Sequence, residues 1–301
     1  MKINQINKKI ILTIFLLISL LILISSCAPG RLGSSEPIQN PDFRKGTQGI
    51  VIKVLKEQLP SKITKEESFP FSLYLENRGS ADAKATLTVS SLPQINLLTE
   101  ETKKFTLKGN TIQQPGELSS IYLFNFQNYV VPPNRILTLT ANVCYSYETT
   151  AVIPVCINPS QNFLSTDPQS CKPTPKVTLS GQGAPITITN VETRVSKNVE
   201  GLFDAFINFE VKNRGKGNAY GTLNSCSSKY NFISLQKVSL ANYDYPGTVE
   251  CNPTELDLSK NQQIKCTIKD MELTGSFITP LLITLEYSYS DTEIVNINVQ
   301  P

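Results

Sequence analysis

The chain has 301 residues, of which 40% are hydrophobic and 18% are charged, a composition typical of a globular protein with room for two domains. The formal net charge of +3 comes from three lysines in the first nine residues, because the other 25 basic and 25 acidic residues cancel. A neutral chain without a basic cluster does not fit a nucleic-acid partner. The sequence also lacks histidine, the usual general base near pH 7 and the commonest metal ligand. We therefore expect no nucleic-acid partner, no metal, no cofactor and no catalytic residues.

The N-terminus has the layout of an export signal. Residues 1–9 are basic, and residues 10–26 are uncharged and mostly apolar. The apolar run ends in Ser25-Ser26-Cys27, which resembles a bacterial-type lipobox and implies cleavage before Cys27 and lipidation of its thiol. The alternatives are an uncleaved anchor helix, for which the run is short, and plain secretion. Lipid and helix both place the rest of the chain on the outer face of the cytoplasmic membrane.

A tether and a duplicated domain are predicted downstream. Residues 28–47 are rich in proline, glycine and serine and read as a flexible tether. Residues 71–79 (FSLYLENRG) align with 207–215 (INFEVKNRG) at an offset of 136 residues. Residues 143–147 (VCYSY) align with 285–289 (LEYSY) at an offset of 142. The same order of two matched segments at nearly the same offset indicates two copies of one domain.

The hydrophobic pattern of both copies has a period of two. Apolar residues occupy alternate positions of 137–147 and again of 153–157, which predicts strands with one buried and one wet face. We expect a hairpin turn between these two runs, near Thr150. The fold class is all-β: two tandem antiparallel β-sandwiches after the N-terminal signal or anchor helix. The predicted limits are 48–157 for the first sandwich, 158–179 for a linker and 180–301 for the second.

Six cysteines remain if Cys27 carries a lipid, and an even number in an exported chain favours disulfides. Parity puts Cys144 and Cys156 on the wet face, opposite each other across the predicted hairpin. We expect them to pair, with Cys156–Cys171 as the rival. A second predicted pair joins the cysteines that bracket a loop and a polar turn, Cys251 and Cys266. That scheme leaves Cys171–Cys226 to clamp the linker to the second sandwich.

Three further patterns can be interpreted either as a binding site or as ordinary structure. Parity places four tyrosines on the face of the core aliphatics, so we expect buried side chains rather than a sugar-binding platform: Tyr145, Tyr147, Tyr287 and Tyr289. The segment Gly181-Gln-Gly183 lacks the third glycine of a phosphate-binding loop, and we expect a flexible joint. The segment Asp291-Thr-Glu293 lacks the spacing of a calcium loop, and we expect a solvated hairpin tip.

The two segments that contain Asn-Arg-Gly, FSLYLENRGSADAKATL and FINFEVKNRGKGNAYGTL, resemble the CARDB group of surface modules, the cell-adhesion-related domain of bacteria and archaea. The resemblance implies a seven-stranded immunoglobulin-like sandwich and a role in the cell envelope, and it brings no catalytic residues. The whole chain also resembles exported envelope proteins of small-genome archaea.

These observations predict a membrane-anchored, cell-surface structural or adhesive binding module without catalytic activity. The expected partners are the membrane, through the N-terminal lipid or helix, and a protein or an envelope polymer. The alternative is an accessory subunit of an envelope complex, such as secretion, pilus or transport machinery.

Overall fold

The structure is a computed structural model that describes residues 44–301 apart from 93, 99–100, 120, 129–130, 160–170, 175, 228–229, 242–247 and 261. The described part is all-β, with one short 3-10 helix, η2(Lys56–Gln58), and no α-helix among those residues. Within the same residues, no helix has the length and apolarity needed to cross a membrane. The predicted signal or anchor segment 1–27, with Cys27, and most of the tether lie outside the described residues.

Two sheets belong to one repeat each. The first outer sheet is built from the first repeat, in the order β1(Ile50–Val54), β3(Ser68–Asn77), β7(Tyr122–Gln127) and β5(Asn96–Leu97). The second outer sheet follows the order β14(Val249–Asn252), β16(Gln263–Met271), β11(Phe203–Asn213), β10(Ile186–Lys197) and β9(Val177–Thr178). All neighbouring strands in both sheets are antiparallel.

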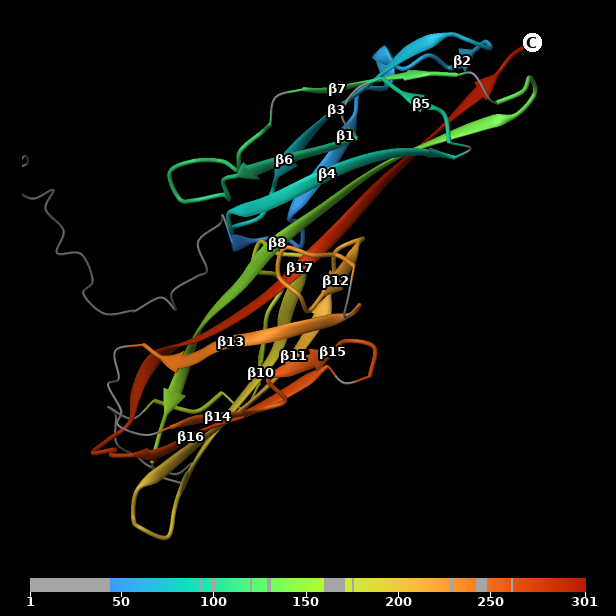
Figure 1. The fold of residues 1–301 in the computed structure, drawn as a ribbon. Coiled ribbons are helices and arrows are strands. Elements are labelled where there is room, and N and C mark those ends of the chain that lie inside the picture. Colours follow the sequence, from blue (N-terminus) through green and yellow to red (C-terminus); the bar gives the residue numbers. More distant parts are fainter. Residues whose placement is uncertain are drawn as a thin grey trace, which may run out of the picture. The chain divides into compact units, whose positions relative to one another are not determined.

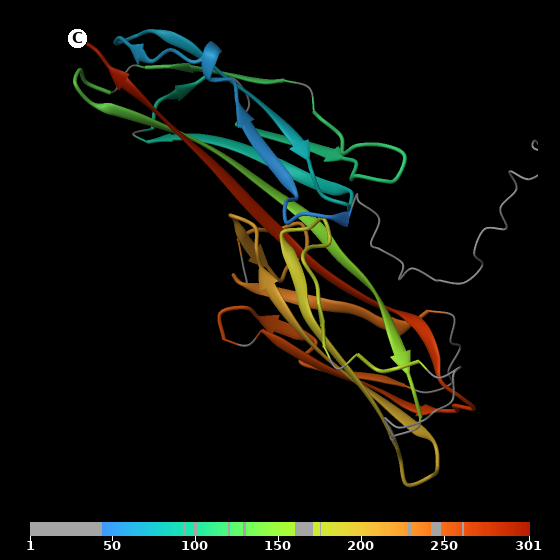
Figure 2. The same cartoon turned by 180° about the vertical axis from the view of Figure 1, so that it is seen from behind.

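The third sheet, here called the shared sheet, contains strands of both repeats. Its order is β15(Glu255–Asp257), β13(Phe232–Leu240), β17(Phe277–Val299), β8(Ile136–Ile157), β4(Ala83–Leu92) and β6(Thr102–Leu107). Two short strands also pair with β17: β12(Asn218–Tyr220) and, in parallel, β2(Lys62–Ile63). Strands β8 and β17 pair without a break from Ile157↔Phe277 to Ile136↔Asn298, and both views show them side by side (Figures 1 and 2).

The predicted hairpin near Thr150 is wrong, because β8 continues straight through it. The odd-numbered residues of β8 are buried from Leu137 to Ile157, so the alternation keeps its phase across the supposed turn. The four residues at that point, Glu-Thr-Thr-Ala, include none of the glycine, proline or asparagine that tight turns favour. The predicted hairpin tip at Asp291 is wrong as well, because Asp291 lies inside the continuous strand β17.

The continuous strands change how the two sandwiches are assembled. The first part of β8 pairs with β4, and its last part runs beside the part of β17 that pairs with β13. Each sandwich is therefore completed by the end of a strand from the other repeat, a feature absent from the predicted limits 48–157 and 180–301. Inward-facing residues of β8 and β17 are buried in both halves, so the two outer sheets pack on the same face of the shared sheet.

Candidate functional site

The first Asn-Arg-Gly segment forms a turn that a core tyrosine holds in place. The Oδ1 atom of Asn77 accepts hydrogen bonds from the Gly79 N–H at 3.1 Å and from the Tyr147 hydroxyl at 3.2 Å. The Asn77 side chain also donates to the Ala81 carbonyl at 2.8 Å, and the Ala81 N–H donates to the Tyr147 hydroxyl at 3.3 Å. The asparagine side chain thus stands in for a backbone turn.

The second Asn-Arg-Gly segment repeats this network. Asn213 accepts from the Gly215 N–H at 3.1 Å and from the Tyr289 hydroxyl at 3.0 Å, and it donates to the Gly217 carbonyl at 2.8 Å. The Gly217 N–H donates to the Tyr289 hydroxyl at 2.9 Å. Each residue of the second network lies at the repeat offset of its segment from its counterpart in the first network, 136 residues for the turns and 142 for the tyrosines. The repeated sequence therefore encodes the same local structure twice.

The glycine of each turn is required by the tyrosine beside it. A Cβ atom on Gly79 would overlap the Tyr147 hydroxyl and also press on the Gly183 carbonyl at 2.5 Å. A Cβ atom on Gly215 would likewise overlap the Tyr289 hydroxyl. Because real Cβ atoms do not approach other atoms this closely, only glycine fits at these two positions.

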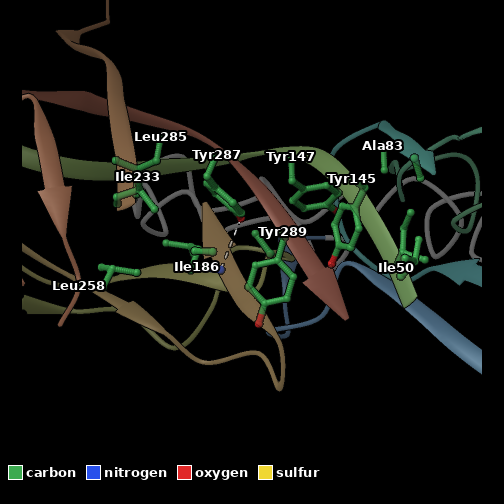
Figure 3. Close-up of a cluster of buried hydrophobic side chains, with 14 of the residues drawn as sticks. Ile50, Ala83, Tyr145, Tyr147, Ile186, Ile233, Leu258, Leu285, Tyr287 and Tyr289 are labelled. Carbon is green, nitrogen blue, oxygen red and sulfur yellow. Dashed lines mark hydrogen bonds between the residues drawn. The ribbon is translucent and has the colours of Figure 1, made fainter. Parts of the chain in front are cut away.

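The four tyrosines of the matched segments lie close together in the core, on the paired strands β8 and β17 (Figure 3). Their rings contact each other across the strands, with centroids 5.8 Å apart for Tyr145 and Tyr289 and 6.4 Å for Tyr147 and Tyr287. All four are buried, as predicted. Desolvation raises the pKa of each hydroxyl above that of a free tyrosine, so the cluster is neutral at physiological pH. The four rings pack the core where β8 and β17 pair.

The segment Gly181-Gln-Gly183 is part of the same core and is not the flexible joint that we predicted. Gln182 is fully buried, and its side chain bonds both the N–H and the carbonyl of Ile188, at 2.9 and 3.1 Å. The Gly183 N–H donates to the Gly46 carbonyl at 3.1 Å, and the Gly183 carbonyl accepts from the Ser80 N–H at 2.8 Å. Because its two glycines have no side chain, the backbone of this segment can enter the core. The glycine content alone had indicated a mobile segment.

The six cysteines of the described residues all form disulfides, and one of the predicted pairs is confirmed. Cys251 and Cys266 face each other on β14 and β16 and are bonded. The expected Cys144–Cys156 pair is wrong, because both cysteines lie on the continuous β8. Cys156 instead bonds Cys171, the rival pair that closes part of the linker. Cys144 bonds Cys226, so the leftover Cys171–Cys226 pair is wrong as well.

Cys226 lies in an insertion that the repeat alignment shows clearly. In the first repeat, Lys84 and Thr86 pair with neighbouring positions of β8, two residues apart. In the second repeat the corresponding partners of β17 are Tyr220 and Ser234, fourteen residues apart. The second repeat therefore has twelve extra residues between these two positions. Ser288 binds them through its hydroxyl, which donates to the Thr222 carbonyl at 2.7 Å.

The face of the shared sheet turned away from both outer sheets is here called the open face. It carries the even-numbered residues of β8 and β17 and their neighbours on β4 and β6. The inserted loop crosses it at Cys144, which explains why Ser288 and Ser290 are buried there. Beyond the loop, on the first repeat's side, the open face is half-buried to exposed. The alternation in the sequence indicated that each of these residues faces solvent. It did not indicate that β4, β6, β8 and β17 would place them together on one face.

Several charged groups of the described residues form ion pairs at the surface. Lys108 lies 2.6 Å from Asp82, and hydrogen bonding to this lysine lowers the pKa of Asp82. Asp291 differs, because burial beside Tyr289 raises its pKa. No group of three or more histidine, cysteine, aspartate or glutamate side chains in the described ranges is arranged to hold a metal ion.

No family model and no curated protein matches the chain. Among solved structures, the chain aligns with the crystal structure of the CsuC–CsuE chaperone–tip adhesion subunit pre-assembly complex from archaic chaperone–usher Csu pili of Acinetobacter baumannii. The alignment covers 84% of this chain and 100% of that chain, at 10% sequence identity and a TM-score of 0.16. A likeness at this level carries no argument about this chain.

Proposed function

We propose that this chain is an exported, membrane-anchored surface protein whose two immunoglobulin-like sandwiches serve as a structural or adhesive binding module without catalytic activity. Lipidation of Cys27, or a retained N-terminal helix, would hold it at the outer face of the cytoplasmic membrane. The observation that carries the proposal is the set of three disulfides in a β-sandwich fold. Disulfides of this kind persist in oxidising compartments outside the cytoplasm.

The Asn-Arg-Gly turns support a module of the CARDB type. In both repeats the motif residues fix a turn against the last strand of their own repeat through a tyrosine hydroxyl. They are thus used for folding, and the surface remains free for a partner. The tyrosine cluster is likewise enclosed in the core. Both features favour a binding or structural role over catalysis.

Surface exposure is the direct test. Intact cells carrying the protein with a C-terminal epitope are treated with a protease that cannot cross the membrane. We expect loss of the epitope at the same protease dose that removes it from lysed cells. In a Cys27→Ser variant, a lipid-anchored protein loses its lipid attachment and fractionates differently, whereas a helix-anchored one stays in the membrane. Full protection of the epitope in intact cells would refute the proposal.

One observation favours the second candidate, an accessory subunit of an envelope complex. Three aliphatic side chains are more than half exposed on or next to β7: Leu118, Ile121 and Leu123. Exposed aliphatic groups that lie close together often mark a protein interface. In mild detergent, a subunit would migrate as a complex larger than the monomer and its micelle. A Leu118→Ser/Leu123→Thr variant would then lose that complex, while Ile278→Thr, at an exposed site on β17, would retain it.

A further inference from the structure

The part of the open face that lies on the first sandwich, including the end of β17, is a lattice of hydroxyl and amide groups. Adjacent strands place their threonines in register, as in the rows Thr102–Thr88–Asn142 and Thr106–Lys84–Ser146. Cross-strand bonds order the side chains, with Thr138 donating to Asn296 at 2.9 Å and Asn142 donating to Thr292 at 2.8 Å. Each of these bonds uses only part of the side chain's capacity, so donors and acceptors remain for a ligand.

Aliphatic side chains lie among these polar groups and are well exposed. Leu92, Ile136 and Ile294 are 72%, 56% and 60% exposed, and all three belong to the even-numbered face of their strands. A surface that alternates hydroxyls, amides and small aliphatic patches matches a sugar chain. Sugar rings present hydroxyl groups at their edges and C–H groups on their faces, so both kinds of protein group find a partner.

The charges of this region have one sign. Lys62, Lys84 and Lys104 all belong to it, and each is exposed. None of the three has an ion-pair partner among the described residues, and none of the paired residues there is acidic. The acidic pair Glu148↔Glu286 begins one row beyond Ser146↔Ser288 and marks the limit of the region. An anionic ligand therefore finds three lysines without an ion-pair partner, and the neighbouring carboxylates lie outside the region, Asp82 paired with Lys108 and Glu148 in the row beyond Ser146.

We propose that this region of the open face binds an acidic polysaccharide of the cell envelope. The proposal deepens the surface function proposed above and rests on it. Lysines separated along the sheet suit a polymer whose charges are separated by neutral sugar atoms. A nucleic-acid duplex, with its much denser charge, is normally bound by many more phosphate contacts than three lysines provide.

The test measures binding of the full-length protein in detergent micelles to three polymers of similar length. Polygalacturonate is the acidic polysaccharide, dextran is the neutral one, and polyglutamate is the acidic polypeptide. The test variant is Lys62→Gln/Lys84→Gln/Lys104→Gln. Its matched control, Lys56→Gln/Lys237→Gln/Lys265→Gln, changes the net charge equally and removes three exposed lysines outside the region. Ile294→Glu places a carboxylate inside the region at an exposed site, where folding is not expected to suffer.

We expect wild type to bind polygalacturonate and not dextran or polyglutamate. The test variant and Ile294→Glu should bind at least about tenfold more weakly, because charge-assisted bonds are lost or opposed, while the control triple stays within about twofold of wild type. Equal loss in both triple variants would overturn the assignment of the region. Equal binding of polyglutamate would overturn the choice of a polysaccharide. Absence of polygalacturonate binding in a protein that the protease places at the cell surface would overturn this inference alone and leave the surface function standing.

Discussion

Ser146 of β8 pairs directly with Ser288 of β17, and the two serines hold the same position in the two repeats. A strand residue that pairs with its own counterpart lies on a local two-fold axis. The same symmetry pairs Tyr145 with Tyr289 and Tyr147 with Tyr287. The two repeats are therefore joined as the two subunits of a symmetric dimer are, through one self-complementary strand pair.

This relationship predicts that the two sandwiches unfold together. Neither β8 nor β17 can leave one sandwich without removing a strand from the other. Hydrogen exchange during urea unfolding should give the same opening free energy for β3 of the first repeat and β11 of the second. Tyrosine fluorescence should follow the same single transition, since the chain has no tryptophan. Two transitions, one for each repeat, would mean that the sandwiches are independent.

The tyrosine hydroxyls that hold the Asn-Arg-Gly turns should contribute to stability. Tyr147→Phe and Tyr289→Phe each leave a backbone N–H without a partner and remove one of the two hydrogen bonds that the asparagine Oδ1 atom accepts, so we expect a loss of about 1–2 kcal/mol in unfolding free energy for each. Tyr74→Phe is the control, because Tyr74 lies half-buried on β3, away from the tyrosine cluster. Urea titrations measure the differences, and losses no larger than that of the control would contradict the assigned role.

The steric role of the turn glycine has a separate test. Gly79→Ala should cost about 1–3 kcal/mol, since the added methyl group overlaps the Tyr147 hydroxyl and presses on nearby carbonyls. In the Tyr147→Phe background the cost of Gly79→Ala should be smaller, because one of the opposing atoms is gone. A double-mutant cycle reads this coupling directly. Strictly additive losses would show that the hydroxyl is not what restricts the position.

Alkaline pH should destabilise the fold through the buried tyrosines. Their pKa values are raised in the folded state by desolvation, whereas a tyrosine in the unfolded chain titrates near pH 10. Above about pH 10 the unfolded chain loses protons that the folded chain keeps. The unfolding free energy should then fall by about 1.4 kcal/mol per pH unit for each such tyrosine. Tyr145→Phe should reduce this slope between pH 10 and 11, and an unchanged slope would contradict the account.

Local patterns in the sequence predicted strands, buried faces and the tyrosine core, because alternation reports which face of a strand meets the core. They did not indicate which strand lies beside which. The hairpin at Thr150 and a continuous strand share the same alternation on both sides of it. Only the unbroken phase and the lack of turn residues separate the two. The Cys251–Cys266 pair was predictable because it joins two neighbouring strands whose cysteines are only 15 residues apart in the sequence.

The open face could not be predicted from the sequence, for a related reason. Each strand's wet residues were visible one at a time, such as Thr138 and Thr140. Their assembly with Thr86, Thr88 and the lysines depends on β8 lying between β4 and β17. That neighbourhood arises from pairings between residues more than 40 positions apart, which period-two patterns do not encode. The inserted loop with Cys226 likewise became apparent only when the registers of the two repeats were compared.

The disulfide map of the protein purified without reductant tests the central claim most directly. A continuous β8 separates Cys144 and Cys156 by about 40 Å of extended chain, since a strand rises about 3.3 Å per residue. We expect mass spectrometry of non-reduced peptides to find Cys144 joined to Cys226, Cys156 to Cys171 and Cys251 to Cys266. A peptide joining Cys144 to Cys156 would establish the hairpin and separate the two sandwiches. Six free thiols would contradict export to an oxidising compartment.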